Sequence, residues 1–199
     1  MKKPASTGHP VHDLISARWS PYWFSQRSID ASDLHSILEA ARWAPSSYNE
    51  QPWAFIVATR AQADEHARLV SCLIEGNRTW AQEAPVLMLG LVRRQFQRNG
   101  KDNVACEHDL GLGAATLTFE ASARGISVHQ MSGIEHQRIR SEYQLPDEVS
   151  PLTALALGYC AAPDDVPERY QERQQRERSR APLSSFVFGG KWGEPTSLL

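Results

Sequence analysis

The sequence predicts an α+β domain in which helices flank a central sheet. Segments with the three-to-four-residue periodicity of amphipathic helices alternate along the chain with short apolar runs typical of strands. A length of 199 residues suits one domain with a real core, and no repeat or low-complexity linker divides the chain. Interleaved elements of this kind pack as layers. We therefore expect residues 11–199 to form a single domain, preceded by a flexible tail at residues 1–10.

Two helices are predicted before the first strand. Residues 11–19 form a short helix that ends near Arg18. Residues 32–44 form a longer helix, because apolar side chains recur at helical spacing and define one buried face: Leu34, Ile37, Leu38 and Ala41. Ser32 is its expected N-cap, since a side-chain hydroxyl there can accept a backbone N–H bond.

The next predicted elements are a strand, a helix and a second strand. Trp53–Thr59 (WAFIVAT) is typical of a buried strand, and residues 61–75 of an amphipathic helix that carries Leu69, Cys72 and Leu73. Pro85 precedes the second strand, VLMLGLV. These elements would place two strands and a helix in direct succession.

Residues 102–124 predict the longest helix, about 33 Å at 1.5 Å per residue. Gly125 is a natural left-handed stop after it. One stripe is apolar (Leu110, Ala114, Leu117 and Ala121) and the adjacent stripe is entirely small (Gly111, Ala115, Thr118 and Ser122). A helix that is apolar on more than one side is usually buried on more than one side. It could therefore be the central helix of a monomer or lie at an interface between two chains.

The last third of the chain contains two further strands and two helices. Ile126–Gln130 and Leu152–Tyr159 predict strands, and residues 135–143 predict the helix between them. The segment 168–178 predicts a mostly solvated helix in which Glu172 can meet Arg176 four residues on. Residues 184–188 (SSFVF) predict a last, short strand.

Composition excludes several classes of protein. Apolar content of 41%, charged content of 22% and a net charge of −2 are ordinary for a soluble domain, and they argue against a nucleic-acid or anionic-membrane partner. The longest apolar runs are too short to span a membrane, and the N-terminus has no apolar stretch typical of a secretory signal. We therefore expect a cytoplasmic protein.

The cysteines and histidines predict no metal site. Cys72, Cys106 and Cys160 are far apart and odd in number, which fits neither a disulfide framework nor a zinc motif. Residues 106–109 (CEHD) are consecutive on a predicted helix, where neighbouring side chains point in different directions and cannot converge on one ion. Free thiols fit the cytoplasm.

Residues 40–55 (AARWAPSSYNEQPWAF) form the most informative stretch. The residue before Pro45 is steered out of the helical region, and Ser46, Ser47 and Asn49 favour local hydrogen bonds over a continued helix. The result is a rigid polar corner between two buried elements, which would suit the edge of a flat heterocycle. The alternative is an ordinary connection between a helix and a strand.

Phosphate would have to be bound by side chains in this protein. The sequence has no Walker loop, and LGLGAA at 110–115 lies within a helical pattern, not after a strand as a dinucleotide fingerprint requires. Arg18 with Ser20, and Arg178 with Arg180, could form a clamp, because guanidinium makes bidentate bonds to phosphate. Taken alone, the arginine-rich tail would be interpreted as a solubilising surface.

These segments together resemble the nitroreductase family of FMN-dependent, NAD(P)H-oxidising enzymes. The resemblance runs through RWSPYWF (18–24), the corner at 40–55, GNRTW (76–80), HQMSG (129–133) and RERSR (176–180), in the family's order. It implies a three-layer α/β/α fold with a mixed or antiparallel central sheet. It also implies a homodimer with the long helix at the interface.

The resemblance assigns cofactor-binding residues motif by motif. It places Arg18, Ser20, Arg178 and Arg180 on the FMN phosphate, with Trp19 and Tyr22 in the same motif. It places on the flavin ring Pro45, Ser46, Ser47, Asn49, Asn77, Gln130, Met131, Ser132 and Gly133. Gly133 suits that role because a missing side chain lets backbone approach a flat ligand, although Asn77 could also be a turn residue and Gly133 a strand-end stop.

Two positions depart from the family's pattern. Many members carry a cation where this chain has Tyr22, and some carry Lys where it has Trp80. Those cations lie near the flavin edge where negative charge accumulates on reduction, so aromatic replacements should weaken that stabilisation. Arg78 is a candidate to compensate. The redox potential and the natural acceptor are therefore not readable from the sequence.

The implied function is hydride transfer from NAD(P)H, through flavin N5, to a small oxidised acceptor in a ping-pong cycle. Nitroaromatics, quinones and conjugated carbonyls are the candidate acceptors, and no side chain is expected to be catalytic. The alternatives are a non-catalytic flavin-binding or sensing module, a relative that reduces aldehydes or enones or acts as a dehydrogenase, and a structural protein without ligand. For the enzyme, the arginines and the polar corner must converge on one crevice.

Overall fold

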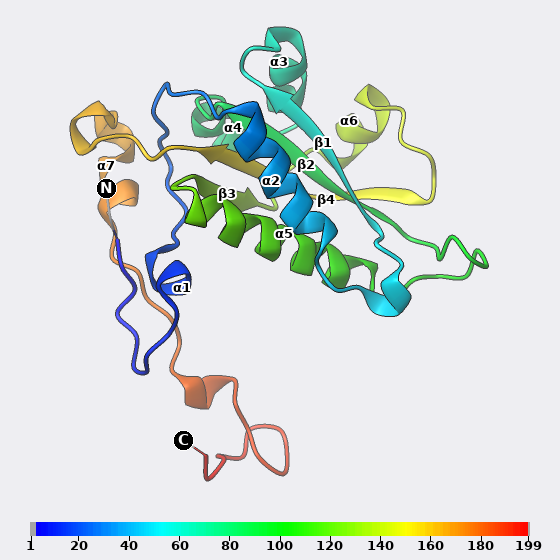
Figure 1. Ribbon diagram of the computed structural model, residues 1–199, viewed down its shortest axis with the longest axis vertical. Helices are drawn as coiled ribbons and strands as arrows, with labels where there is room; N and C mark the ends of the chain where they lie inside the picture. The colour runs from blue at the N-terminus through cyan, green and yellow to red at the C-terminus, as the bar shows by residue number, and fades with distance from the viewer. Residues whose placement is uncertain (1–2, 199) are drawn as a thin grey trace.

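The computed structural model describes residues 3–198 and shows a four-stranded sheet between two layers of helices (Figure 1). The strands are β1 (Trp53–Thr59), β2 (Val86–Arg93), β3 (Ser127–Met131) and β4 (Val149–Gly158). Their order is β1-β2-β4-β3, and every neighbouring pair is antiparallel. The expected α+β layered fold is confirmed, and its sheet is antiparallel.

One face of the sheet is covered by α2 (Ala31–Arg42) and α5 (Cys106–Ala123) (Figure 1). Ile37 of α2 and Leu117 of α5 are fully buried against Met88 and Leu155 of the two central strands. Ala41 is also buried, and Leu34 and Leu38 pack half-buried beside it, as their spacing predicts. Removal of this apolar surface from water is what attaches the two helices to the sheet.

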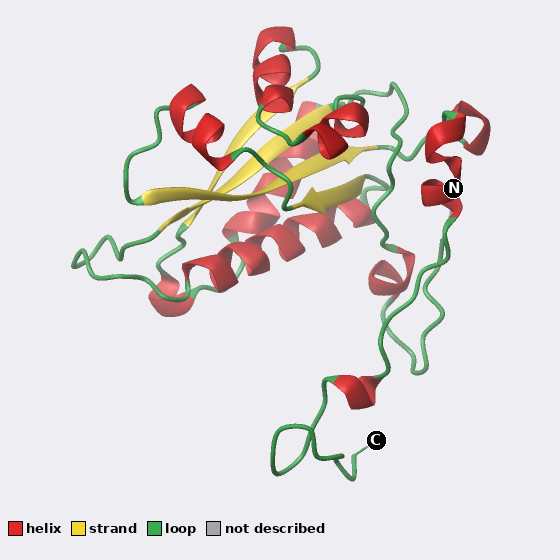
Figure 2. Ribbon diagram, turned by 180° about the vertical axis from the view of Figure 1, so that it is seen from behind, coloured by secondary structure: helices red, strands yellow, loops and turns green. Residues whose placement is uncertain are grey.

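The opposite face is covered by α3 (Ala63–Ser71), α4 (Glu75–Ala81) and α6 (His136–Glu142) (Figure 2). Leu69, Trp80 and Ile139 come from these three helices and pack on Leu89 in a second apolar cluster. Because both faces are covered, the central strand β2 is buried except at its last residue. Strand β1 lies at an edge and is only half-buried apart from Ala58, so it is less buried than its apolar sequence predicts.

Helix α5 matches its prediction closely. Its predicted apolar stripe is fully buried, and Thr118 of the small stripe is buried while Gly111 is exposed. Gly125 adopts φ +72°, and the N–H of Ile126 then donates to the carbonyl of Ala121 over 2.8 Å, which closes the helix end. The helix begins at Cys106, four residues later than expected.

Three other predicted elements need correction. The helix expected at 61–75 ends at Ser71, because the chain breaks at Cys72 and Leu73 pairs with Ile134, and a separate helix, α4, begins at Glu75. Helix α2 begins at Ala31 with Asp30 as its N-cap residue, so Ser32 is not the cap. Residues 184–188 do not form a strand, because the nearby chain offers them only one isolated bridge, Phe188 to Pro195, beside the short 3-10 turn η3 (Leu183–Ser185).

The N-terminal segment and the segment that follows α7 (Glu168–Gln175) run side by side near α1 (Asp13–Ala17) (Figure 1). The N–H of Ala5 donates to the carbonyl of Ser16 over 2.8 Å, and Arg178 Nη1 donates to the carbonyl of Lys3 over 2.6 Å. Residues 1 and 2 lie outside the described part of the chain, so flexibility of the N-terminal tail stays a prediction. Beyond α7 the C-terminal segment extends away from the body (Figure 2).

Candidate functional site

A cluster of guanidinium groups lies at the C-terminal end of α5. Arg18 follows α1, whereas Arg178 and Arg180 follow α7, so both ends of the chain contribute. Arg18 Nη1 donates to Ser20 Oγ over 3.3 Å. Burial lowers the pKa of Arg18, and the charges of Arg178 and then Arg180 lower this pKa further. The expected clamp residues are therefore brought together, close enough to repel one another.

Lys3 joins this cluster, although no sequence motif includes it. Its Nζ donates to the carbonyl of Gln174 over 2.8 Å and lies 4.7 Å from the ring centroid of Trp19, which is buried. A cavity of about 310 Å³ opens between Lys3, Arg18 and the end of α5 at Ser122. Lys3 and Arg18 are the two cations that line this cavity, and neither forms an ion pair with another residue in the range 3–198, which suits a bound phosphate.

An aromatic group lies next to Arg18, made by Tyr22, Trp80 and His129. The His129 ring centroid is 4.4 Å from that of Trp80 and 4.8 Å from that of Tyr22. His129 Nδ1 donates to the carbonyl of Pro21 over 2.8 Å. Burial lowers the pKa of His129, and the Arg18 charge adds to this effect although the Pro21 bond opposes it. Trp80 Nε1 is buried and has no hydrogen-bond partner within the described chain.

Asn77 and Gly133 form a direct contact where α4 meets the end of β3. Asn77 Nδ2 donates to the carbonyl of Gly133 over 3.0 Å. A Cβ atom at position 133 would lie 2.5 Å from Asn77 Nδ2 and 2.5 Å from Cδ1 of Ile74. The glycine is therefore required for helix packing on the strand end, a reason different from the ligand approach that the sequence suggests.

The three residues before Gly133 alternate across β3. Met131 is buried, whereas Gln130 and Ser132 are exposed. Gln130 reaches α5, where its Nε2 donates to the carbonyl of Ala114 over 3.2 Å and to Thr118 Oγ1 over 3.1 Å. Gln130 therefore ties the edge strand to α5.

Arg78 is committed to a structural role. Its Nη2 donates to the carbonyl of Leu73 over 2.8 Å and to that of Ser71 over 3.3 Å, at the end of α3. These bonds satisfy carbonyls that a helix leaves without partners. The expectation that Arg78 supplies the cation missing at Tyr22 and Trp80 therefore finds no support in its contacts.

The polar corner, residues 45–51, contains a run of unusual backbone. Pro45 lies three residues beyond α2, and Ser47–Asn49 form the 3-10 turn η1. Tyr48, Asn49 and Gln51 have φ values of 54°, 55° and 50°, in the left-handed region that side chains disfavour. Ser46 Oγ accepts the N–H of Gln51 over 3.0 Å, which holds the turn closed.

The corner is anchored on the first turns of α5. The N–H of Ser47 donates to Asp109 Oδ2 over 3.0 Å, and Asp109 is buried. The cavity beside Arg18 reaches α5 at Ser122. Thirteen residues of helix separate these two points, about 20 Å.

The corner is also distant from Asn77 and Gly133. It leads into β1, one edge of the sheet, whereas Gly133 follows β3, the other edge. Three strand spacings, about 14 Å, lie between these edges. Within one chain, Arg18 lies beside the C-terminal end of α5 and the corner is bound near its N-terminal end, so a single chain does not bring the two into one crevice. Their convergence on one cofactor stays a prediction.

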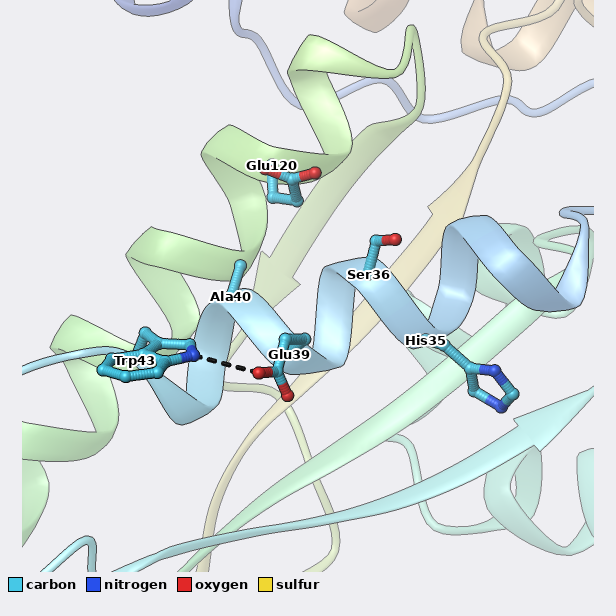
Figure 3. A pocket seen from close by; sticks show the side chains of 6 residues that line it. All are labelled: His35, Ser36, Glu39, Ala40, Trp43 and Glu120. Carbon is cyan, nitrogen blue, oxygen red and sulfur yellow. Dashed lines mark hydrogen bonds between the residues drawn. The ribbon is translucent and has the colours of Figure 1, made fainter.

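A larger cavity, about 540 Å³, lies between α2 and α5 and contains none of the expected site residues (Figure 3). Glu39 and Glu120 line it, and Trp43 Nε1 donates to Glu39 Oε1 over 2.9 Å (Figure 3). Hydrogen bonds from Arg42 and Trp43 lower the pKa of Glu39 to about 2. Two carboxylates would repel a phosphate, so this cavity is a poor candidate for the phosphate site although it is the larger of the two.

Within residues 3–198, no three histidine, cysteine or acidic side chains are placed to share a metal ion. No helix in that range is long and apolar enough to cross a bilayer. The three cysteines are free, with Cys72 and Cys106 buried.

Comparison with known proteins then decides the family. The family model described as "Nitroreductase family" matches residues 15–159. This chain belongs to the nitroreductase family. The match spans the arginine motif, the polar corner, Asn77 and Gly133, so most of the nitroreductase segments named above lie inside it.

Two curated relatives are similar over most of their length. A Streptomyces coelicolor protein named "Putative NADH dehydrogenase/NAD(P)H nitroreductase" is 36% identical over 80% of this nitroreductase and 86% of its own chain. A Mycolicibacterium smegmatis protein, an uncharacterized 15.4 kDa chain, is 31% identical over 67% of this chain and 88% of its own.

Solved structures share the three-layer nitroreductase fold. A crystal structure described as an "oxidoreductase containing FMN" superposes with a TM-score of 0.87 at 31% identity, covering 94% of this chain and 95% of the other. A nitroreductase family protein from Clostridium difficile superposes with a TM-score of 0.70 at 23% identity, over 89% and 96% of the two chains. The second likeness concerns the fold alone.

Proposed function

We propose that this protein is an FMN-dependent oxidoreductase that takes hydride from NAD(P)H and reduces a small oxidised acceptor. The carrying observation is the cluster of Lys3, Arg18, Arg178 and Arg180, which the fold assembles from both ends of the chain. Two similar proteins support the proposal: the solved structure described as an oxidoreductase containing FMN, and the Streptomyces coelicolor protein named as a putative NAD(P)H nitroreductase.

The residues present fit FMN on two grounds. The cationic cluster and Ser20 supply several donors for a phosphate, which Arg18 and Ser20 would hold from one side and Arg178 and Arg180 from the other. The buried Trp80 Nε1 has no acceptor among residues 3–198, which is costly, and an isoalloxazine edge carries such acceptors.

Bound FMN would supply the redox chemistry, a ping-pong hydride transfer from NAD(P)H to a nitroaromatic, quinone or conjugated carbonyl. The side chains of the protein would bind and orient FMN. Tyr22, Trp80 and His129 form an aromatic wall beside the phosphate clamp that would exclude water from the ring. Gln130–Gly133 and Asn77 form the second ring-side element.

We propose that the active form is a homodimer in which the polar corner of one chain completes the site of its partner. A two-fold axis brings the same surface of both chains together. The clamp of each chain can then meet the corner of its partner, so the dimer holds two complete sites. Gly111 on α5 is exposed, and the C-terminal segment carries Phe186, Trp192 and Leu198 with 60%, 92% and 86% of their surface exposed. Exposed large apolar groups of this kind mark interaction surfaces.

Colour and turnover test the proposal. The purified protein should be yellow, release FMN on denaturation and bleach when NADH or NADPH is added. A colourless preparation that does not take up added FMN would overturn it. A screen of NADH against NADPH, followed by a panel of nitroaromatics, quinones, aldehydes and enones, would then assign the reductant and the acceptor class.

A non-catalytic flavin-binding module is the second candidate. The specific observation in its favour is that Tyr22 and Trp80 stand where cations are common in the family, and Arg78 is engaged elsewhere. Steady oxidation of NAD(P)H with menadione would exclude this candidate. The three free thiols agree with a cytoplasmic location for either function.

A further inference from the structure

A hairpin between β2 and α5 projects past the end of the sheet beside the polar corner (Figure 1). Its closure is regular: Gln95 pairs with Asp102, and the N–H of Phe96 donates to the carbonyl of Lys101 over 2.8 Å. Gly100 supplies the left-handed turn residue, with φ +67°. The hairpin is thus a built element that carries its own side chains to a fixed place.

The tip of the hairpin is fastened to the corner by aromatic and polar contacts. Phe96 meets the ring of Tyr48 edge to face, with centroids 6.0 Å apart and planes at 84°. Arg98 lies over both rings, its Cζ 4.2 Å from the Tyr48 centroid and 5.0 Å from that of Phe96. Glu50 accepts the N–H of Gln97, which adds a bond between the two segments.

Tyr48 contacts the hairpin with one part of its ring, but it is mostly exposed and its backbone is strained. Its side chain is 75% exposed, and its φ of 54° belongs to a conformation that costs a bulky L-residue about 1–2 kcal/mol. Strained residues of this kind persist where surrounding contacts hold them, and they cluster at active sites and ligand clamps. The exposed ring is therefore a candidate contact surface and not a core residue.

Arg98 gives this surface an unneutralised charge. Within residues 3–198 it takes part in no ion pair, whereas the neighbouring Arg94 is paired with Glu107. The Glu50 carboxylate already accepts the Gln97 N–H. A guanidinium on an aromatic shelf can bind a carboxylate through paired donors while the rings contact a planar molecule.

We propose that Tyr48, Phe96 and Arg98 form the acceptor-binding wall of the partner's site and select planar aromatic acceptors that carry a negative charge. This assignment rests on the proposed function, because it requires the corner that holds Tyr48 to face the partner's flavin. Asn49 and Ser47 would then contact the ring edge, and Tyr48 between them would contact the molecule that stacks on the ring. Arg98 would bind the anionic substituent.

The test compares two acceptors of nearly equal shape, 4-nitrobenzoate and neutral 4-nitrobenzamide, on the flavin-loaded full-length protein. Arg98→Gln should raise KM for 4-nitrobenzoate about tenfold and change KM for 4-nitrobenzamide less than twofold. Arg98→Lys should fall between parent and Arg98→Gln, because it keeps the charge and loses the planar fork. Each effect is a ratio of variant to parent, so the different reduction potentials of the two acceptors cancel.

Lys101→Gln is the matched control, since it removes one positive charge from the same hairpin without touching the aromatic rings. It should leave both KM values within twofold of the parent. The preference for the anion should also weaken as salt rises from 20 to 300 mM, because the site is exposed.

The outcomes separate this inference from the proposed function. The acceptor wall is overturned if Arg98→Gln changes KM equally for the two acceptors, or if Lys101→Gln changes KM as much as Arg98→Gln does. In either case, continued turnover of 4-nitrobenzamide still supports the proposed oxidoreductase. Failure of the parent to bind FMN or to reduce either acceptor overturns both proposals. A selective loss for 4-nitrobenzoate in Arg98→Gln alone supports the wall.

Discussion

The two halves of the proposed binding site lie at the two ends of α5 and are built in opposite ways. At the C-terminal end, Lys3 and Arg18 meet Arg178, which lies more than 150 positions further along the chain, and all three present long, charged side chains. At the N-terminal end, the corner is one continuous stretch, residues 45–51, and acts through backbone in left-handed conformations. Charge suits a phosphate that accepts bonds from many directions, whereas a ring edge needs donors fixed in place.

Removal of the central cation of the clamp should have the largest effect. Arg18→Ala should raise the FMN dissociation constant roughly ten- to hundredfold, since a hydrogen bond to a charged group contributes about 1.5–3 kcal/mol. Arg180→Ala should fall in the same range. Titration of the apoprotein by flavin fluorescence measures both, with Arg138→Ala on α6 as the control that should bind like the parent. Unchanged affinity in either clamp variant would remove that residue from the phosphate site.

Substitutions in the corner should change FMN affinity by removing hydrogen-bond donors held in fixed positions, not by removing charge. Asn49→Gly keeps the left-handed backbone and removes the amide, so FMN affinity should fall about fivefold, the loss of one hydrogen bond of about 1 kcal/mol. Gln144→Gly is the matched control, because Gln144 has φ 48° in a turn outside the site. Both variants should unfold at the same temperature as the parent or higher, since glycine relieves the strain. Equal FMN affinity in the two variants would contradict a role for the corner.

The smallest expected effect is the pH dependence of stability that His129 contributes at the clamp end of α5. The pKa of His129 is lowered from 6.5 in the folded protein, first by burial and then by Arg18. The neutral form is therefore favoured on folding, so its stabilisation is complete above pH 6.5 and is lost as pH falls below that value. Urea unfolding between pH 7.5 and 5.5 should show a smaller decrease in stability for His129→Asn, which can still donate to the Pro21 carbonyl.

His66 is the internal comparison for that titration. Burial also lowers its pKa, against the bond to the Ala84 carbonyl, so it contributes a decrease of the same sign away from the clamp. Adding inorganic phosphate beside Arg18 should flatten the contribution of His129 and leave that of His66 unchanged. Identical pH profiles for parent and His129→Asn would show that His129 does not titrate in this range.

Local patterns predicted most of the fold. The buried stripe of α5, its stop at Gly125 and the bounds of β1 all follow from short-range spacing. The errors occur where a distant partner decides the structure. Leu73 leaves its helix to pair with Ile134, and residues 184–188 have no neighbouring strand to complete a sheet.

The candidate site also contains features that local sequence predicts and features that depend on distant partners. The polar corner is visible in the sequence because proline, serine and asparagine control backbone within a few residues. The sequence does not predict the roles of Lys3 and His129, because their partners are distant along the chain: Lys3 meets Gln174 across 171 positions, and His129 packs on Tyr22 and Trp80. The separation of corner and clamp could not be predicted either, because it depends on which edge strand each motif precedes or follows.

A mixed dimer tests most directly whether clamp and corner act together across two chains. One chain carries Arg18→Ala, the other carries Ser47→Ala with Asn49→Gly, and the two are co-purified through different tags. The proposed arrangement puts both defects in one site and leaves the other unaltered, so the mixed dimer should bind one FMN with the parent's affinity. If no site in the mixed dimer reaches the parent's affinity, each chain builds its site alone and the shared site is wrong.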